Sequence, residues 1–232
     1  MTEGPPKVWV TRARPGADDT ASRLKDLGFT PVVAPLLEVS FLGMDPIDLT
    51  DVAALAFTSA RGVEALAGRS GIRNLPVFAV GAATAQAARA AGFTQVTAGD
   101  GDVEALADLI ACRHPPAATL LHAAAAQPAG DLVGDLTRRG LSARALAVYE
   151  TVESDPAAIL PHLPTLSAAL VHSPRAGRAL AAFLAGHPAP EIRLLALSSA
   201  VAKPLAAVKC AAIGVAPFPN EASLLKLLSK AG

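Results

Sequence analysis

The sequence predicts an α/β protein of two similar doubly wound parallel-sheet domains, and three observations lead to that prediction. The chain has 232 residues, enough for two small domains. Short apolar runs alternate with Ala- and Leu-rich stretches at helical spacing, which is typical of parallel strands joined by right-handed crossover helices. An internal duplication then indicates that the domain occurs twice.

The predicted elements follow a repeated order of strand, small or hydroxyl turn residue, and helix. Met1 to Pro6 precede the first strand and are expected to form a loose tail. The strands of the six main units are Lys7–Thr11, Ala53–Thr58, Val77–Val80, Thr119–His122, Ala168–His172 and Leu194–Leu197. Further strands are expected at Thr30–Pro35, Thr94–Ala98, Ala143–Tyr149 and Cys210–Val215.

The duplication is seen in three segments that recur in the same order. The segment that begins GADDTASRLKDLGF reappears as GDLVGDLTRRGL, with Gly28 matching Gly140 at an offset of 112. FTSARGVEAL matches HSPRAGRAL, which pairs Ser59 with Ser173, and AVGAATAQAA matches ALSSAVAKPL. With the first segment called A and the second and third together called B, the order is A, B, A′, B′. The repeat leaves open whether A packs with B or with B′.

Composition excludes several classes of partner. The 20 basic and 20 acidic residues cancel, so no overall field attracts nucleic acid or an anionic membrane. Apolar runs stay well short of the roughly 18 residues of a membrane span, and the first residues lack signal-peptide features, so we expect a cytoplasmic protein. Cys112 and Cys210 have no metal-type spacing and are expected to be small buried residues.

Ligands of open α/β sheets bind beyond the carboxyl ends of the strands, where helix N-termini present backbone N–H groups. Small residues in these turns let a carboxylate or phosphate approach the backbone. The alternative is that Thr58, Ser59, Ser173 and Ser198 are only helix N-caps. The candidate turns are Thr11–Gly16, Thr58–Gly62, Val80–Thr84, Ala126–Asp131, Ser173–Gly177 and Ser198–Ala202.

Arginine and tyrosine residues near these turns could bind a carboxylate or donate a proton. Arg12 directly follows the first strand, and its guanidinium could hold a carboxylate through two hydrogen bonds. Arg14, Arg61 and Arg175 occupy similar turns, where a solvated charge is the alternative. Tyr149, at the end of an apolar run, could donate a proton to a leaving hydroxyl or simply anchor a domain edge.

The motifs of several enzyme classes are missing from the sequence. It has no GxGxxG or P-loop motif after a strand, no HExxH, and no GxSxG elbow. The five histidines are scattered, and His122 and His172 end strands without a patterned partner. The sequence therefore predicts no metal site and no nucleotide cofactor.

The ordered motifs resemble those of the uroporphyrinogen-III synthase family. VWVTRARPGADDTASRLKDLGFTPVVAPLLEV is similar to the family's amino-terminal block, and LAFTSARGVEAL, VFAVGAATAQAARAAGF and LAVYET are similar to its Phe-Thr-Ser, Val-Gly-x-x-Thr-Ala and Val-Tyr-x-Thr blocks. LVHSPRAGRALAAFL and LLALSSAVAKPL resemble the remaining two units. Each block alone is unspecific, whereas the ordered set spans nearly the whole chain.

The resemblance implies a monomer of two α/β domains joined by two antiparallel linker strands, with a ligand cleft between the domains. Domain 1 would comprise residues 1–36 and 152–232, domain 2 residues 39–149, with linkers near 37–38 and 150–151, which pairs A with B′. It also implies cofactor-free cyclisation of hydroxymethylbilane, a linear tetrapyrrole with eight carboxylates, to uroporphyrinogen III, with loss of water and inversion of the last pyrrole ring.

Site residues follow from the resemblance position by position. Tyr149 occupies the Tyr of the Val-Tyr-x-Thr block and would assist departure of the hydroxyl. The turn AAAA at 123–126 replaces a common Leu-Arg-Gly, and Val201 stands where many members have Thr, which puts ligand contacts there in doubt. The residues expected to bind substrate are Arg12, Ser59, Thr84, Ser173, Ser198 and Ser199.

Two other functions are compatible with such a chain. A non-catalytic two-domain binding protein for a small anionic ligand would also use strand-end turns, and the alanines at 123–126 favour it. A cofactor enzyme such as a methyltransferase could share the fold, although the missing Gly-rich loop argues against it. Identification of the bound ligand or product separates the three.

Overall fold

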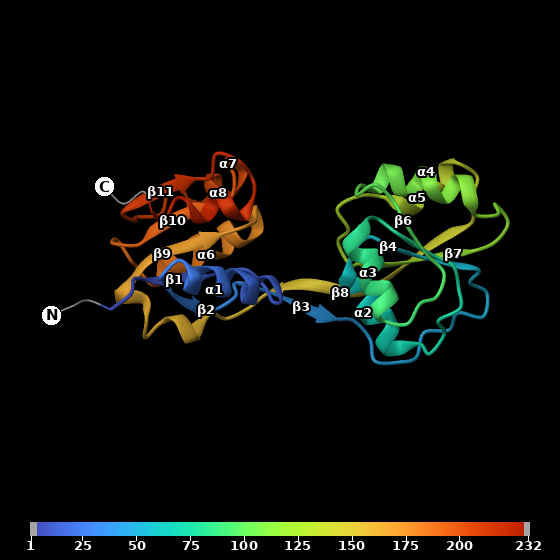
Figure 1. The fold of residues 1–232 in the computed structure, drawn as a ribbon, viewed down its shortest axis with the longest axis horizontal. Helices are drawn as coiled ribbons and strands as arrows, with labels where there is room; N and C mark the ends of the chain where they lie inside the picture. Colours follow the sequence, from blue (N-terminus) through green and yellow to red (C-terminus); the bar gives the residue numbers. More distant parts are fainter. Residues whose placement is uncertain (1–3, 230–232) are drawn as a thin grey trace. The chain divides into compact units, whose positions relative to one another are not determined.

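The computed structural model describes residues 4–229, so Met1 to Glu3 of the predicted tail lie outside the described part. The chain divides into two compact units. Unit 1 contains the residues up to Glu38 and those from Val152 onward, and unit 2 contains Val39–Thr151. The chain passes from one unit to the other along β3 (Leu37–Phe41) and returns along β8 (Ala143–Glu153) (Figure 1).

Unit 1 has a five-stranded parallel sheet in the order β11-β10-β9-β1-β2. The direction of winding reverses between β1 and β9, which makes their carboxyl ends the topological switch point where such folds bind ligands. The elements are β1 (Lys7–Val10), α1 (Gly16–Asp26), β2 (Thr30–Val33), η1 (Ala157–Ile159), η2 (Leu163–Thr165), β9 (Leu166–Val171), α6 (Pro174–Gly186), β10 (Arg193–Ala196), α7 (Ser199–Ala202), η3 (Lys203–Leu205), β11 (Ala212–Val215) and α8 (Glu221–Leu225).

Unit 2 has a six-stranded sheet in the order β3-β8-β7-β4-β5-β6. Strands β4 to β8 pair in parallel, and the switch point lies between β4 and β7. Hydrogen bonds from Leu42 to Val148 and from Ser154 to Leu36 show that the β3 and β8 segments run antiparallel. The other elements are β4 (Ala54–Phe57), α2 (Ala60–Arg69), β5 (Val77–Ala79), α3 (Ala82–Ala90), β6 (Val96–Ala98), α4 (Val103–Arg113), β7 (Leu120–Ala125) and α5 (Leu132–Arg138).

The two units repeat one topology, and strand register matches the duplication in the sequence. Order β2-β1-β9-β10-β11 in unit 1 corresponds to β8-β7-β4-β5-β6 in unit 2. Unit 1 therefore combines segments A and B′, as the family resemblance implies. The equivalent pairs are Val8 with Pro31 and Leu120 with Ala143 at the offset of 112, and Val8 with Ala168 and Leu120 with Ala54 across the switch point.

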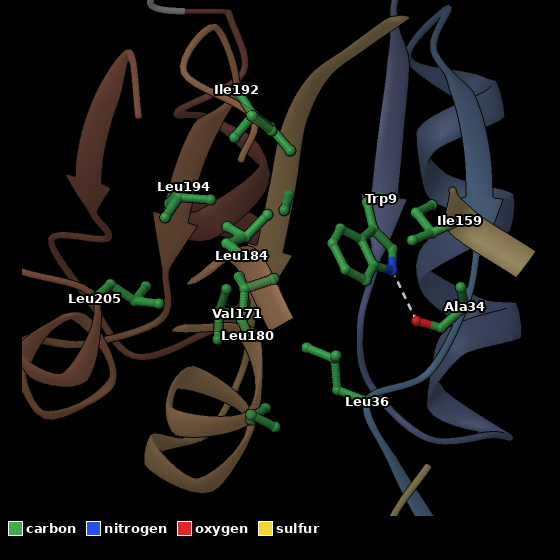
Figure 2. Packing of buried hydrophobic residues seen from close by; sticks show 14 of the residues in the cluster. Trp9, Ala34, Leu36, Ile159, Val171, Leu180, Leu184, Ile192, Leu194 and Leu205 are labelled. Atoms are coloured by element: carbon green, nitrogen blue, oxygen red, sulfur yellow. Dashed lines mark hydrogen bonds between the residues drawn. The ribbon is translucent and has the colours of Figure 1, made fainter. Parts of the chain in front are cut away.

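Each sheet is covered on both faces because alternate strand residues point to opposite sides. In unit 1, Trp9 faces α6 and Val8 and Val10 face α1 and α8. The indole N–H of Trp9, which is fully buried, donates to the carbonyl of Ala34 at 2.7 Å, so its polar atom is satisfied. Figure 2 shows Trp9 among the aliphatic side chains of the α6 face. Unit 2 has the same two-sided arrangement.

Several sequence expectations differ from the structure. Cys112 is exposed and Cys210 half-buried, so the expectation that both are buried is wrong. Cys112 lies on the solvent side of α4, whose Leu106 and Ile110 face the core. The strand Leu37–Phe41 is absent from those that the pattern predicts, and β8 continues to Glu153, beyond the predicted end at Tyr149.

Candidate functional site

The carboxyl ends of the parallel strands position most of the expected site residues. In unit 1, Arg12 follows β1, Ser173 follows β9 and Ser198 follows β10. These strands are neighbours in the sheet, so the three residues succeed one another along a single edge. In unit 2, Ser59 follows β4 and the turn before Thr84 follows β5 in the same way.

At the switch point of unit 1, polar side chains surround the carboxylate of Glu221, the first residue of α8. Its Oε2 accepts from Arg12 at 3.3 Å and lies 2.9 Å from Nε2 of His172, while Oε1 accepts from the Thr20 hydroxyl at 2.6 Å. We call Arg12, Thr20, His172 and Glu221 the Glu221 cluster. Arg12 is thus an ion-pair partner within the protein as well as a candidate ligand for substrate.

The charge state of Glu221 follows from these neighbours. Burial alone would raise its pKa, but hydrogen bonds from His172 and Thr20, together with the charges of His172 and Arg12, outweigh burial and lower the pKa to about 2. Glu221 is therefore ionised at neutral pH. The guanidinium of Arg12 lies over Gly16, where a Cβ atom would approach it to 2.7 Å.

The serines of unit 1 differ in what their side chains do. Ser173 is the N-cap of α6 and accepts from the backbone N–H of Ala176 at 3.1 Å. Ser198 occupies the N-cap position of α7 but makes no side-chain capping bond, and Ser199 is exposed. The N-cap alternative thus describes Ser173, whereas the hydroxyl of Ser198 is not used in capping.

Hydroxyl groups, an imidazole and one guanidinium lie at the switch point of unit 2. Ser59 caps α2 by accepting from the backbone N–H of Arg61 at 3.1 Å. Thr58 is not the cap; its hydroxyl lies 3.1 Å from Nε2 of His122 on β7. Burial lowers the pKa of His122 to about 4, so this imidazole is neutral at physiological pH. Arg61 forms an ion pair with Glu64 at 2.7 Å.

Thr84 and Tyr149 lie in different surroundings. Thr84 is only 7% exposed in the first turn of α3, and its equivalent in unit 1 is Val201, a core residue. Tyr149 is half-buried against the unit 2 core and pairs with Ala125, the last residue of β7. Because β7 and β8 are parallel, Tyr149 is level with the carboxyl edge of the sheet although β8 continues beyond it.

The alanine-rich segment at 123–126 forms the end of β7 and the residue after it, and it carries no polar side chain. Ala123 and Ala124 are buried in β7, and the backbone N–H of Ala126 donates to the carbonyl of Tyr149 at 2.8 Å. The N-terminus of α2 packs closely here: a Cβ atom on Gly62 would lie 2.4 Å from the carbonyl oxygen of Ala123. This turn contributes shape and backbone atoms but no charge.

Three hollows of the surface lie away from the carboxyl ends of the strands. One is lined by α1 and α8 residues such as Asp26 and Leu225, another by Pro46 and Arg69, and a third by Pro164 and Pro190. Among residues 4–229, no group of three His, Cys, Asp or Glu side chains is arranged to hold a metal ion. No helix in that range has the length and apolarity needed to cross a membrane.

Sequence reasoning did not identify the Glu221 cluster. The sequence pattern shows His172 only as a strand-end histidine, and its partner lies 49 residues further along the chain. The available signal was weak: a carboxylate directly after the N-cap Asn220, beyond the last strand of the unit. Similarly, the contact of His122 with Thr58 joins two neighbouring strands that are distant in sequence.

Comparison with known proteins supplies the context for this geometry. The family model described as Uroporphyrinogen-III synthase HemD matches residues 18–226. The chain is similar to the crystal structure of uroporphyrinogen-III synthetase from Helicobacter pylori, with 18% identity, coverage of 98% of this chain and 100% of that one, and a TM-score of 0.66. A mutant uroporphyrinogen III synthase from Thermus thermophilus matches with 19% identity, coverage of 97% and 98%, and a TM-score of 0.50. No curated protein matches the chain.

Proposed function

The chain belongs to the uroporphyrinogen-III synthase HemD family, and we propose that it cyclises hydroxymethylbilane to uroporphyrinogen III, with loss of water and inversion of the last pyrrole ring. The observation that carries this proposal is the family match across residues 18–226. The enzyme would be a lyase that works in the cytoplasm as a monomer on a small-molecule substrate.

The strand-end turns support binding of a substrate with eight carboxylates. Ser59, Ser173 and Ser198 begin helices at these edges, where backbone N–H groups and helix dipoles attract negative charge. Arg12 adds a guanidinium at the switch point of unit 1. Thr84 and Ser199 stay in the proposed set of binding residues, with Thr84 acting mainly through packing because it is buried.

Tyr149 is the proposed proton donor to the departing hydroxyl. Its phenol is half-buried and belongs to a residue level with the carboxyl edge of unit 2. A phenol can donate a hydrogen bond or proton to a hydroxyl that leaves as water. The main task of the protein is then to hold the chain ends so that the route with ring inversion wins over direct closure to the symmetrical isomer.

The test is the isomer composition of the product. Purified protein is given hydroxymethylbilane, the products are oxidised, and porphyrin isomers I and III are separated by chromatography. We expect isomer III to predominate over a protein-free control. Isomer I alone would contradict the proposed function and favour a non-catalytic binding protein.

A further inference from the structure

Glu221 holds side chains from three different elements at one point. Its carboxylate accepts from Thr20 on α1, from Arg12 after β1, and lies within hydrogen-bond distance of His172 after β9. All three elements meet at the switch point of unit 1, so one residue of α8 fixes the polar groups that border the expected ligand position.

Unit 2 shows that the Glu221 cluster is not a requirement of the fold. Glu221 follows the capping residue Asn220 in the same way that Val103 follows the capping residue Asp102. The unit 2 residues that correspond to Arg12, Thr20 and His172 are identified from the sequence repeat and the strand register. Arg12 corresponds to Ala124 and Thr20 to Leu132. His172 corresponds to Thr58, and Glu221 to Val103.

Burying the polar groups of the Glu221 cluster costs free energy of folding. The mainly apolar residues at the equivalent positions of unit 2 avoid this cost. The side chains of His172 and Glu221 are only 10% and 15% exposed, and burying charged groups is unfavourable even when they are paired. In addition, Nδ1 of His172 is buried and has no hydrogen-bond partner among the described residues. Unit 2 reaches the same topology without this cost, so the cluster serves something other than folding.

We propose that Glu221 is a positioning residue that holds Arg12 and His172 for contact with a carboxylate of the tetrapyrrole at the edge of unit 1. This inference rests on the proposed function. A guanidinium has five N–H donors, and the bond to Glu221 uses one of them. Arg12 is 37% exposed, so the side chain held by Glu221 is still accessible to a ligand. Holding it in advance reduces the side-chain entropy lost on binding.

The test compares Glu221→Gln with Glu104→Gln. Glu104 is an exposed carboxylate in the first turn of α4, the helix of unit 2 that corresponds to α8. In Glu221→Gln we expect KM for hydroxymethylbilane to rise about tenfold while kcat changes less than about twofold, since positioning acts on binding. Glu104→Gln should match the wild type in both. An unchanged KM in Glu221→Gln would overturn the inference, whether or not the thermal midpoint falls.

A second variant separates positioning from stability. Thr20→Leu with Glu221→Val copies the apolar residues of unit 2. It should remain folded, with a thermal midpoint below that of the wild type because Arg12 and His172 lose their carboxylate partner, and it should show the same rise in KM. A wild-type KM in this folded variant would also contradict the inference.

Binding measurements keep the inference testable if the proposed function fails. Trp9 lies on β1, three residues before Arg12, and is the only tryptophan, so its fluorescence can be titrated with uroporphyrin III, a tetrapyrrole with eight carboxylates. We expect the Kd to rise about tenfold in Glu221→Gln relative to wild type and Glu104→Gln. Equal Kd values would refute the role of Glu221, whereas absence of isomer III in all three proteins would refute only the synthase activity.

Discussion

At the scale of single residues, the two switch points differ in charge. Unit 1 has Arg12, His172 and Glu221 there, while unit 2 has Thr58 beside a neutral His122. The strand ends of unit 1 therefore present an ionic cluster, whereas those of unit 2 present hydroxyl groups, backbone N–H groups and the paired Arg61. This asymmetry within a duplicated structure is what makes individual substitutions informative.

The role of Tyr149 is tested by Tyr149→Phe. Loss of the phenolic proton should lower kcat for isomer III about 100-fold, at the low end of general-acid contributions, with KM nearly unchanged. Steady-state kinetics with chromatographic detection of the isomers measures both. Because Phe retains the ring that packs against the unit 2 core, the thermal midpoint should stay the same. A variant with wild-type kcat would leave Tyr149 only the role of an aromatic anchor.

His122 should make the stability of the protein sensitive to mild acid. Its pKa is about 4 in the folded protein, against an ordinary histidine value of 6.5, so the unfolded chain binds the proton first as pH falls. The stabilisation is fully present above pH 6.5 and is lost progressively toward pH 4, by about 3 kcal/mol at most. The free energy of unfolding, measured by urea titration at several pH values, should fall in this window.

The control for this prediction is His122→Val, which copies the equivalent residue Val10 of unit 1. The variant should lose most of the pH dependence between pH 6.5 and 4. If wild type and variant fall in parallel as pH decreases, His122 is not the cause.

The residue-level site was only partly predictable from sequence. Strand-end turns located Arg12 and Ser173 because position in a parallel sheet follows from the order of elements. The link between His172 and Glu221 was not predictable, since it depends on the packing of α8 against α1 and β9. The expectation for Cys112 fails because cysteine is usually buried, whereas here the core face of α4 is formed by other residues.

At the scale of elements, α2 depends on close approach to β7. A Cβ atom at Gly62 would lie 2.4 Å from the carbonyl oxygen of Ala123, whereas one at Gly68 on the same helix would meet nothing within 4 Å. Gly62→Ala should therefore cost about 3 kcal/mol, since backbone atoms must shift. Gly68→Ala should be neutral or stabilise by up to about 1 kcal/mol through helix propensity.

Urea denaturation of the two alanine variants checks this prediction. The midpoint of Gly62→Ala should be lower than that of wild type, and the midpoint of Gly68→Ala should be equal or higher. A similar change in both variants would show that close packing against Ala123 does not limit this helix.

Most elements were predictable because the strand and helix patterns are clear. The strands expected from pattern occur close to their predicted places, and the repeat is reproduced by strand register. The hydrophobic pattern does not predict the strand Leu37–Phe41, because only its first residue is buried and its partner β8 is over a hundred residues away. Pairing between segments so distant is not visible in local periodicity.

At the scale of the whole molecule, each unit has its own core on both sides of its sheet. Unit 2 is a single continuous segment, and its two core clusters come entirely from residues between Leu49 and Val148. A fragment of residues 39–151 should therefore fold alone and unfold cooperatively on heating, as followed by circular dichroism. A fragment without a cooperative transition would mean that unit 2 needs unit 1 to be stable.

The pairing of segment A with B′ illustrates what the sequence alone leaves open. The repeat is consistent with both partitions, and the family resemblance was needed to choose between them. The structure shows the physical basis of the choice, since β1 pairs with β9 and β4 with β7. Pairing between strands that are distant in sequence decides which segments form one sheet. No local pattern encodes this pairing.

The most direct test of the account is the isomer ratio formed by protein that has been treated with a chelator and desalted. Because strand-end turns and Tyr149 would provide the selectivity, isomer III should predominate without added metal or organic cofactor. Formation of isomer I alone, at the rate of the protein-free control, would contradict the account.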